Sequence, residues 1–238
     1  FTMSSKNKYK ILLSILIPIY NEEKTLKKIL KKVNSIKISK EIIVINDGSI
    51  DNSLKILNEN KDLFNSMITY KKNRGKGFAC KQGILIAKGE YTIIQDADLE
   101  YNPDNYLDLL KAINHDHQVV YGSRVLRGGK INIPKGLRPY LSKFANFILT
   151  KISNLLNNQN LTDAHTCYKL FKTKIIQNIE LKENGFAFCP EITSKLSKLG
   201  IKIKEVPIDY NGRGYNEGKK IKFYHAIEAV ISLFKYNF

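Results

Sequence analysis

Apolar runs that end abruptly in polar residues divide the first half of the chain. Four of them, at residues 11–19, 41–45, 91–94 and 118–121, are rich in β-branched and other apolar residues and have the length of a strand. A fifth, weaker segment at 67–70 fits the same interpretation. Continuous apolar runs are typical of parallel strands, because helices cover both of their faces.

The segments between these runs carry apolar residues at helical spacing. Asn21 is expected to cap the first helix, with Glu22 and Glu23 in its first turn. Further helices are predicted at 54–57, at 79–87 and from residue 103 onwards. Strands that alternate with helices predict an α/β fold with a doubly wound, mostly parallel sheet. The apolar stripe of the first helix consists of Leu26, Ile29, Leu30 and Val33.

The second half of the chain departs from this alternation. We expect a loop at 125–136, a long helix at 137–156, a helix ending at Gly200, a strand at 201–208, a flexible loop at 211–218 and a basic amphipathic helix at 219–238. Residues 162–171 are polar and then partly apolar. The helix at 137–156 mixes large apolar side chains with Lys143 and Lys151, so it either lies on a membrane or packs against the sheet. Contact of either long helix with a partner protein also stays open.

Two aspartates separated by one alanine follow the apolar run at 91–94. Side chains alternate between the faces of a strand, so Asp96 and Asp98 point the same way. At the carboxyl end of a buried strand they would repel each other unless a cation lay between them. Hard oxygen ligands favour Mg²⁺ or Mn²⁺, with substrate phosphates completing the coordination shell. The alternative is a solvated turn after a strand.

Composition narrows the classes of partner. The 238-residue chain has a formal net charge of +17 at pH 7, which suits nucleic acid, an anionic membrane or a phosphorylated substrate. All five arginines lie in or beside glycine-containing loops, and a planar guanidinium suits phosphate. No cluster of basic and aromatic residues on one element supports nucleic-acid binding, so no nucleic-acid partner is predicted.

The cysteines and the apolar runs bear on cellular location. Cys80, Cys167 and Cys189 are far apart and odd in number, which predicts free thiols in a reducing compartment. No apolar run reaches 18 residues, so no membrane span is predicted. His115 and His117 are interpreted as surface residues, whereas His165 is left open.

Four motifs in the first half occur in an order that resembles family 2 glycosyltransferases of the GT-A fold. They are residues 15–22 (ILIPIYNE), 46–51 (NDGSID), 73–77 (NRGKG) and 96–98 (DAD). Residues 121–124 (YGSR), 162–163 (TD) and 205–207 (EVP) resemble the dolichyl-phosphate mannosyltransferase branch and its bacterial polyprenyl-phosphate relatives. The resemblance covers about residues 12–235, although Asn46 stands where many relatives carry aspartate. It implies an αβα sandwich formed by one GT-A domain over 3–238, with C-terminal amphipathic helices on its surface.

The resemblance also implies roles for individual residues. Residues 3–124 would bind the nucleotide-sugar, and residues 125–238 would face the acceptor and the membrane. Donor-binding residues are expected to be Pro18, Tyr20, Glu22, Asp47, Arg74, Asp96 and Arg213. Metal ligands are expected to be Asp96, Asp98 and Glu100. Acceptor-phosphate residues are expected to be Arg124, Arg138 and Ser142. Catalytic residues are expected to be Asp98, Arg124 and Asp163.

Each role has a simpler alternative. Asp47 would cap the helix at 50–58, the arginines would be solvated surface residues, and Asp163 would orient an arginine or cap a helix. These alternatives stay open at the level of the sequence.

The reaction implied is inverting, Mg²⁺- or Mn²⁺-dependent transfer of a sugar from GDP-mannose or a UDP-hexose to a polyprenyl or dolichyl phosphate. A phosphate monoester is mostly anionic at neutral pH, since its second pKa is about 6, and needs no general base. The alternative acceptor is a hydroxyl of a saccharide or lipid, for which Asp163 would serve as the base. A lipid acceptor implies peripheral contact with an anionic membrane, at its cytoplasmic face.

Overall fold

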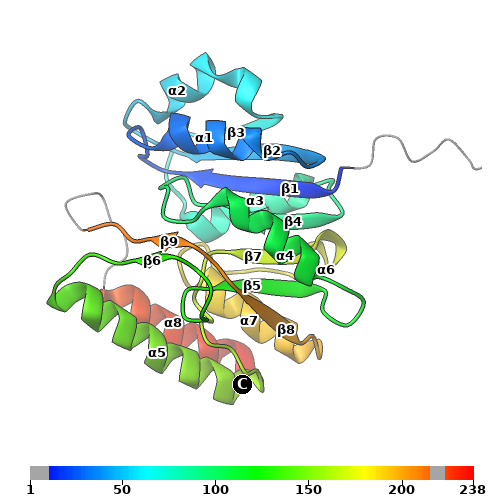
Figure 1. The fold of residues 1–238 in the computed structure, drawn as a ribbon, viewed down its shortest axis with the longest axis vertical. Helices are drawn as coiled ribbons and strands as arrows, with labels where there is room; N and C mark the ends of the chain where they lie inside the picture. The colour runs from blue at the N-terminus through cyan, green and yellow to red at the C-terminus, as the bar shows by residue number, and fades with distance from the viewer. Residues whose placement is uncertain (1–10, 215–222) are drawn as a thin grey trace, which may run out of the picture.

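A mostly parallel sheet forms the centre of the structure, a computed structural model that describes residues 11–214 and 223–238. Within these residues seven strands are joined in the order β3-β2-β1-β4-β7-β5-β8 (Figure 1). β7 runs antiparallel to both of its neighbours, and the other pairings are parallel. The strands are β1 (Leu13–Ile19), β2 (Lys40–Asp47), β3 (Ser66–Tyr70), β4 (Tyr91–Ile94), β5 (Val119–Ser123), β7 (Lys169–Lys172) and β8 (Ile203–Pro207). The predicted α/β class and mostly parallel sheet are therefore confirmed.

Helices cover both faces of the sheet, as an αβα sandwich requires. One face packs on α1 (Leu26–Ser35), α2 (Ser53–Glu59) and α4 (Tyr106–Ala112). The other face packs on α3 (Lys76–Ile86), α6 (Thr173–Gln177) and α7 (Phe188–Lys198). α5 (Leu137–Asn157) and α8 (Phe223–Asn237) pack on each other and on α7, at the opposite end of the molecule from α2 (Figure 1). Shorter elements are η1 (Lys61–Leu63), η2 (Pro103–Asn105), β6 (Ile131–Asn132) and β9 (Tyr210–Asn211).

Alternation along β1 divides the core between the two faces. Ile15 and Ile17 belong to the cluster under α1, whereas Leu16 between them belongs to the cluster under α3. The predicted stripe of α1 is buried as expected. Full burial of such aliphatic side chains contributes about 1.5–3 kcal/mol each. Both sides of the central strands are thus fixed by apolar contacts, which holds their carboxyl ends in place.

The predicted cap of the first helix is wrong. α1 begins at Leu26, with Thr25 as its N-cap residue, so Asn21 lies outside the helix. Asn21 has a φ of 52°, in the left-handed region that asparagine tolerates. Its side-chain oxygen accepts a hydrogen bond from the backbone N–H of Ile50 at 2.9 Å. Asn21 therefore joins the loop after β1 to the loop after β2.

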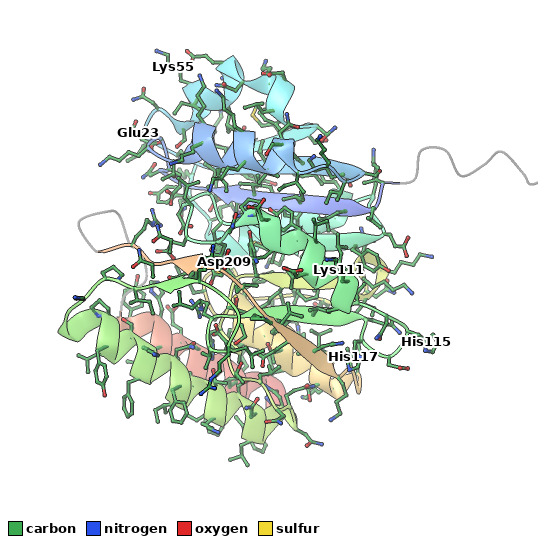
Figure 2. The ribbon with its side chains drawn as sticks, viewed as in Figure 1. Glu23, Lys55, Lys111, His115, His117 and Asp209 are labelled. Carbon is green, nitrogen blue, oxygen red and sulfur yellow. The ribbon has the colours of Figure 1, made fainter. Side chains whose placement is uncertain are left out.

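The later elements largely follow the predictions. The helix expected at 137–156 is α5, and the strand expected at 201–208 contains β8. The basic helix is described from Phe223 onwards as α8, whereas residues 215–222 of the expected loop and helix lie outside the described residues. The described segments contain no helix that is both long and apolar enough to cross a bilayer. His115 and His117 point outward from the loop after α4, as predicted (Figure 2).

Candidate active site

Five strands place polar groups at one edge of the sheet. The segments that follow β1, β2, β4 and β5 lie there because these strands are parallel. β7 runs the other way, so the segment that precedes it, including Cys167, reaches the same edge. The site is therefore built from both halves of the chain.

Asp47, the last residue of β2, holds the start of α3. Its carboxylate is 2% exposed and accepts hydrogen bonds from the backbone N–H groups of Arg74 at 3.0 Å and Gly75 at 2.7 Å. Gly75 has a φ of 105°, and a Cβ atom there would lie 2.4 Å from the backbone oxygen of Asn184. Burial raises the pKa of Asp47. Asp47 does not cap the helix at 50–58, because α2 begins at Ser53 with Asn52 as its N-cap residue.

Arg74 and the residues after β1 line the same edge. The Arg74 guanidinium lies 3.7 Å from the centre of the Phe78 ring, which orients an otherwise exposed side chain. Pro18 and Tyr20 are partly exposed at the end of β1. Pro18, Tyr20 and Arg74 are thus accessible to a ligand at this edge, whereas Asp47 is buried.

Asp96 and Asp98, which we call the aspartate pair, each hold a cation of the chain. Lys76 Nζ lies 2.5 Å from Asp96 Oδ1 and also donates to Cys167 Sγ at 3.1 Å. Arg213 Nη2 lies 2.7 Å from Asp98 Oδ2. These contacts show that the aspartate pair is not a solvated turn. Neither Lys76 nor Cys167 was assigned a role from the sequence.

Glu100 is bound by groups of the β9 segment. Its Oε2 accepts a hydrogen bond from the Tyr210 hydroxyl at 2.8 Å, and its Oε1 accepts one from the Arg213 backbone N–H at 3.0 Å. The Arg213 guanidinium also reaches Glu22 at 3.4 Å, so one arginine joins the loops after β1 and β4. Glu100 thereby positions Arg213, and its expected role as a metal ligand stays a prediction.

A second charged group, formed by Arg124 and Asp163, lies next to the aspartate pair and its cations. Asp163 is fully buried. Its carboxylate accepts hydrogen bonds from Arg124 Nε at 2.7 Å and Nη2 at 2.8 Å, which makes a bidentate ion pair. Asn146 of α5 donates to Asp163 Oδ1 at 3.0 Å. Burial opposes ionisation, but Arg124 outweighs it and lowers the pKa of Asp163 to about 2. The ring of Tyr210 lies 5.2 Å from the Arg124 guanidinium, which connects this pair to Glu100.

The segment that carries Asp163 is fixed from two sides. Glu205 of β8 accepts hydrogen bonds from the backbone N–H groups of Thr162 at 2.7 Å and Asp163 at 2.9 Å. The buried Lys169 ammonium donates to the Ala164 carbonyl at 2.8 Å. Burial lowers the pKa of Lys169 to about 8. These contacts give the motif residue Glu205 a positioning function that sequence reasoning did not assign.

Three residues considered from the sequence remain to be placed, which are Arg138, Ser142 and His165. Ser142 is exposed on α5, and Arg138 lies in the first turn of α5 with its side chain outside what the structure describes. His165, left open by the sequence, has a ring Nε2 that is buried without a hydrogen-bond partner among the described residues. Burial lowers the pKa of His165 to about 4, which keeps the ring neutral.

The aspartate pair fits a divalent cation that is shared with a substrate. Burial, with repulsion from Asp96 and Glu100, raises the pKa of Asp98 to about 7. A bound divalent cation would stabilise the ionised carboxylate of Asp98 and so offset the effects of burial and repulsion. No three His, Cys, Asp or Glu side chains converge on a metal position in the described part of the chain. Oxygens of a diphosphate would therefore have to complete the coordination shell.

Taken together, an α/β sandwich with an aspartate pair and several basic side chains at the carboxyl ends of its strands defines a class of proteins that bind phosphorylated ligands at that edge. Residues 14–180 match the sequence family described as glycosyl transferase family 2. The chain belongs to this family and is a glycosyltransferase.

Curated relatives extend the match beyond residue 180. A dolichyl-phosphate β-glucosyltransferase of Trichomonas vaginalis is 29% identical over 94% of this chain and 72% of its own length. A dolichol-phosphate mannosyltransferase of Pyrococcus furiosus is 28% identical over 87% of this chain, which spans 58% of that protein. Among solved structures, glucosyl-3-phosphoglycerate synthase of Mycobacterium tuberculosis, in complex with Mn²⁺, UDP and its product, superposes with a TM-score of 0.67 at 14% identity. That superposition covers 94% of this chain and 79% of the other, and it confirms the GT-A fold.

Proposed function

We propose that the chain transfers a hexose from a nucleotide-sugar to the phosphate of a polyprenyl lipid such as dolichyl phosphate, with inversion at the anomeric carbon. Residues 3–124 would bind the donor and residues 125–238 the acceptor. Both curated relatives are named for dolichyl-phosphate acceptors but for different sugars, so the acceptor class carries more support than the sugar.

The observation that carries this proposal is the Arg124–Asp163 pair. A carboxylate with a pKa of about 2 that accepts four hydrogen bonds is a poor base for a hydroxyl acceptor. A lipid phosphate is already anionic and needs a cationic partner instead, which Arg124 and Arg138 would provide, while Ser142 would add a hydroxyl donor. In this proposal Asp98 binds the divalent cation. Asp163 therefore acts as the residue that orients Arg124, and the hydroxyl-acceptor alternative loses its base.

The donor would lie against the residues after β1, β2 and β4. Tyr20 would pack on the base or ribose with Pro18 and Glu22 nearby, Asp47 would accept a hydrogen bond from the base, and Arg74 would reach the nucleotide. Mg²⁺ or Mn²⁺ on the aspartate pair, with Glu100 close by, would neutralise charge on the departing nucleoside diphosphate. Arg213 would add a second positive charge on the same leaving group. This arrangement favours displacement by an anionic acceptor in one step.

An exposed apolar surface on α5 and α8 supports a lipid acceptor. The large side chains of Phe144, Phe147, Ile231 and Phe234 on α5 and α8 are 48–60% exposed. α5 also sends Asn146 inward to Asp163, so one helix reaches both the Arg124 pair and the exposed apolar surface. We infer that α5 and α8 contact an anionic membrane, at its cytoplasmic face, and present the lipid phosphate to Arg124.

The acceptor is tested with matched lipids. The purified chain is given UDP- and GDP-sugars with Mg²⁺ or Mn²⁺ and either a polyprenyl phosphate or the corresponding polyprenol. We expect metal-dependent release of nucleoside diphosphate with the phosphate only, and its loss in Asp98→Asn. Turnover with the polyprenol and not with the phosphate would overturn the proposal in favour of a hydroxyl acceptor.

A further inference from the structure

Lys76 has no role in the function proposed above, yet it contacts the aspartate pair. It is the first residue of α3, and its side chain and that of Asp96 are 16% and 14% exposed. An ammonium has three N–H groups. Two of them point to Asp96 Oδ1 and Cys167 Sγ, and the described residues offer no partner to the third. Lys76 is thus a partly buried cation at the position where a divalent cation is expected.

The Lys76 ammonium and a divalent cation would compete for the same carboxylate. Asp96 Oδ1 is 2.5 Å from Nζ, so a metal ion bound to that oxygen would lie close to a second positive charge in a buried site. Like charges in such surroundings repel strongly, and one of the two must move. The Cys167 thiol holds Lys76 only weakly. Burial raises the pKa of this thiol and keeps it neutral, so it offers no charge to the ammonium.

A diphosphate offers Lys76 a new partner within reach of a flexible four-carbon side chain. The N-terminal end of α3, which begins at Lys76, carries a partial positive charge that also favours an anion there. We propose that Lys76 neutralises Asp96 until the divalent cation binds, and that it then moves to the diphosphate of the donor. The identity of the diphosphate rests on the proposed function, whereas the exchange at Asp96 rests on the contacts of Lys76.

Two consequences of opposite sign follow. Without nucleotide, Lys76 lowers the affinity for metal, because the metal has to displace it. With metal present, Lys76 raises the affinity for a nucleoside diphosphate, because it becomes a ligand of the phosphates. A residue that only supported the fold would change both affinities in the same direction.

The test measures binding and not turnover. Mn²⁺ is titrated into the nucleotide-free protein at about pH 8, well above the reference pKa of an aspartate, and free Mn²⁺ is followed by electron paramagnetic resonance. UDP and GDP are then titrated calorimetrically at saturating Mn²⁺. We expect Lys76→Met to bind Mn²⁺ about fivefold tighter or more, a usual size for coupling between two sites. It should bind the nucleoside diphosphate about tenfold more weakly, the usual effect of losing a charged hydrogen bond.

Two further variants make the result decisive. Lys81→Met removes a charge from a partly exposed position of the same helix, where Nζ contacts Asn184 at 2.7 Å, and should change neither affinity. Lys76→Gln keeps a hydrogen-bond donor without the charge and should behave like Lys76→Met, so it replaces that variant if the latter does not fold. Unchanged or weaker Mn²⁺ binding in both variants at position 76, or unchanged diphosphate binding, would overturn the inference. Failure of the lipid assay alone would leave it standing.

Discussion

Asp163 is a fully buried carboxylate whose charge is balanced by a single guanidinium. Its two oxygens together accept four hydrogen bonds, three from Arg124 and one from Asn146. Removing one partner of a buried pair leaves the other charge uncompensated, which is far more destabilising than the pair is stabilising. Asp163 therefore contributes both to the stability of the fold and to the orientation of Arg124.

Asp163→Asn should lower the free energy of unfolding by about 3 kcal/mol at neutral pH, the usual effect of breaking a buried ion pair. The pKa of Asp163 is about 2 in the folded protein against 3.8 as the reference value. A lowered pKa stabilises the folded state above the reference value, and this contribution is lost as the pH falls through about 2. The difference between variant and wild type, measured by urea unfolding, should therefore narrow as the pH falls below 3.8.

Asp116→Asn is the matched control, because Asp116 is 83% exposed on the loop after α4. It should leave the unfolding free energy within about 0.5 kcal/mol of the wild type. A variant at position 163 as stable as this control at neutral pH would contradict the prediction.

At this scale the sequence reveals charged motifs but not their partners. The aspartate pair is predictable as two carboxylates that follow an apolar strand. The alternation used to place them on one side does not apply, because β4 ends at Ile94 and the pair lies in the turn beyond it. Lys76 is not, because a lysine at a helix start resembles any solvated lysine until Asp96 is placed beside it. The alternative role of Asp47, capping a nearby helix, is wrong because its carboxylate accepts hydrogen bonds from the backbone N–H groups of Arg74 and Gly75, which are distant in sequence.

Among the strands of the central sheet, β7 is the one with no matching prediction from the hydrophobic pattern. It has four residues and begins with the buried Lys169, so its sequence lacks a continuous apolar run. The Lys169 ammonium lies 3.6 Å from the centre of the Tyr121 ring and donates to the Ala164 carbonyl. Only the assembled sheet provides these partners. By contrast, β1, β2, β4 and β5 are predictable, because each is an apolar run followed by polar residues.

The exposed apolar surface of α5 and α8 should bind vesicles that contain anionic lipid. Changing Phe144 and Phe147 together to glutamate should weaken binding about tenfold or more, because two aromatic side chains no longer enter the bilayer interface. Flotation of the protein with vesicles measures this directly.

Ile50→Glu is the control for that experiment, since Ile50 is 86% exposed just before α2, at the other end of the molecule. It should float like the wild type. Equal flotation of all three proteins would show that α5 does not carry the membrane contact.

At the scale of the whole molecule, exposed lysines lie at both ends. They occur on α1 at one end, and at the other end Lys143, Lys151 and Lys235 stand among the exposed apolar side chains of α5 and α8 (Figure 1). The net charge of +17 can attract anionic donors from solution, an effect that salt screens. The candidate site lies between these ends.

The position of β7 also sets the order in which the sheet can be completed during synthesis. β4 and β5 emerge from the ribosome well before residue 169, and neither pairs with the other in the finished sheet. Until β7 arrives, each keeps an open edge that another nascent chain can pair with. A fragment that ends at residue 160 should therefore sediment as aggregates where the full chain stays in solution, and a dispersed fragment would contradict this. β5 also pairs with β8, so its second edge stays open until Ile203–Pro207 has emerged, and only then is the sheet complete.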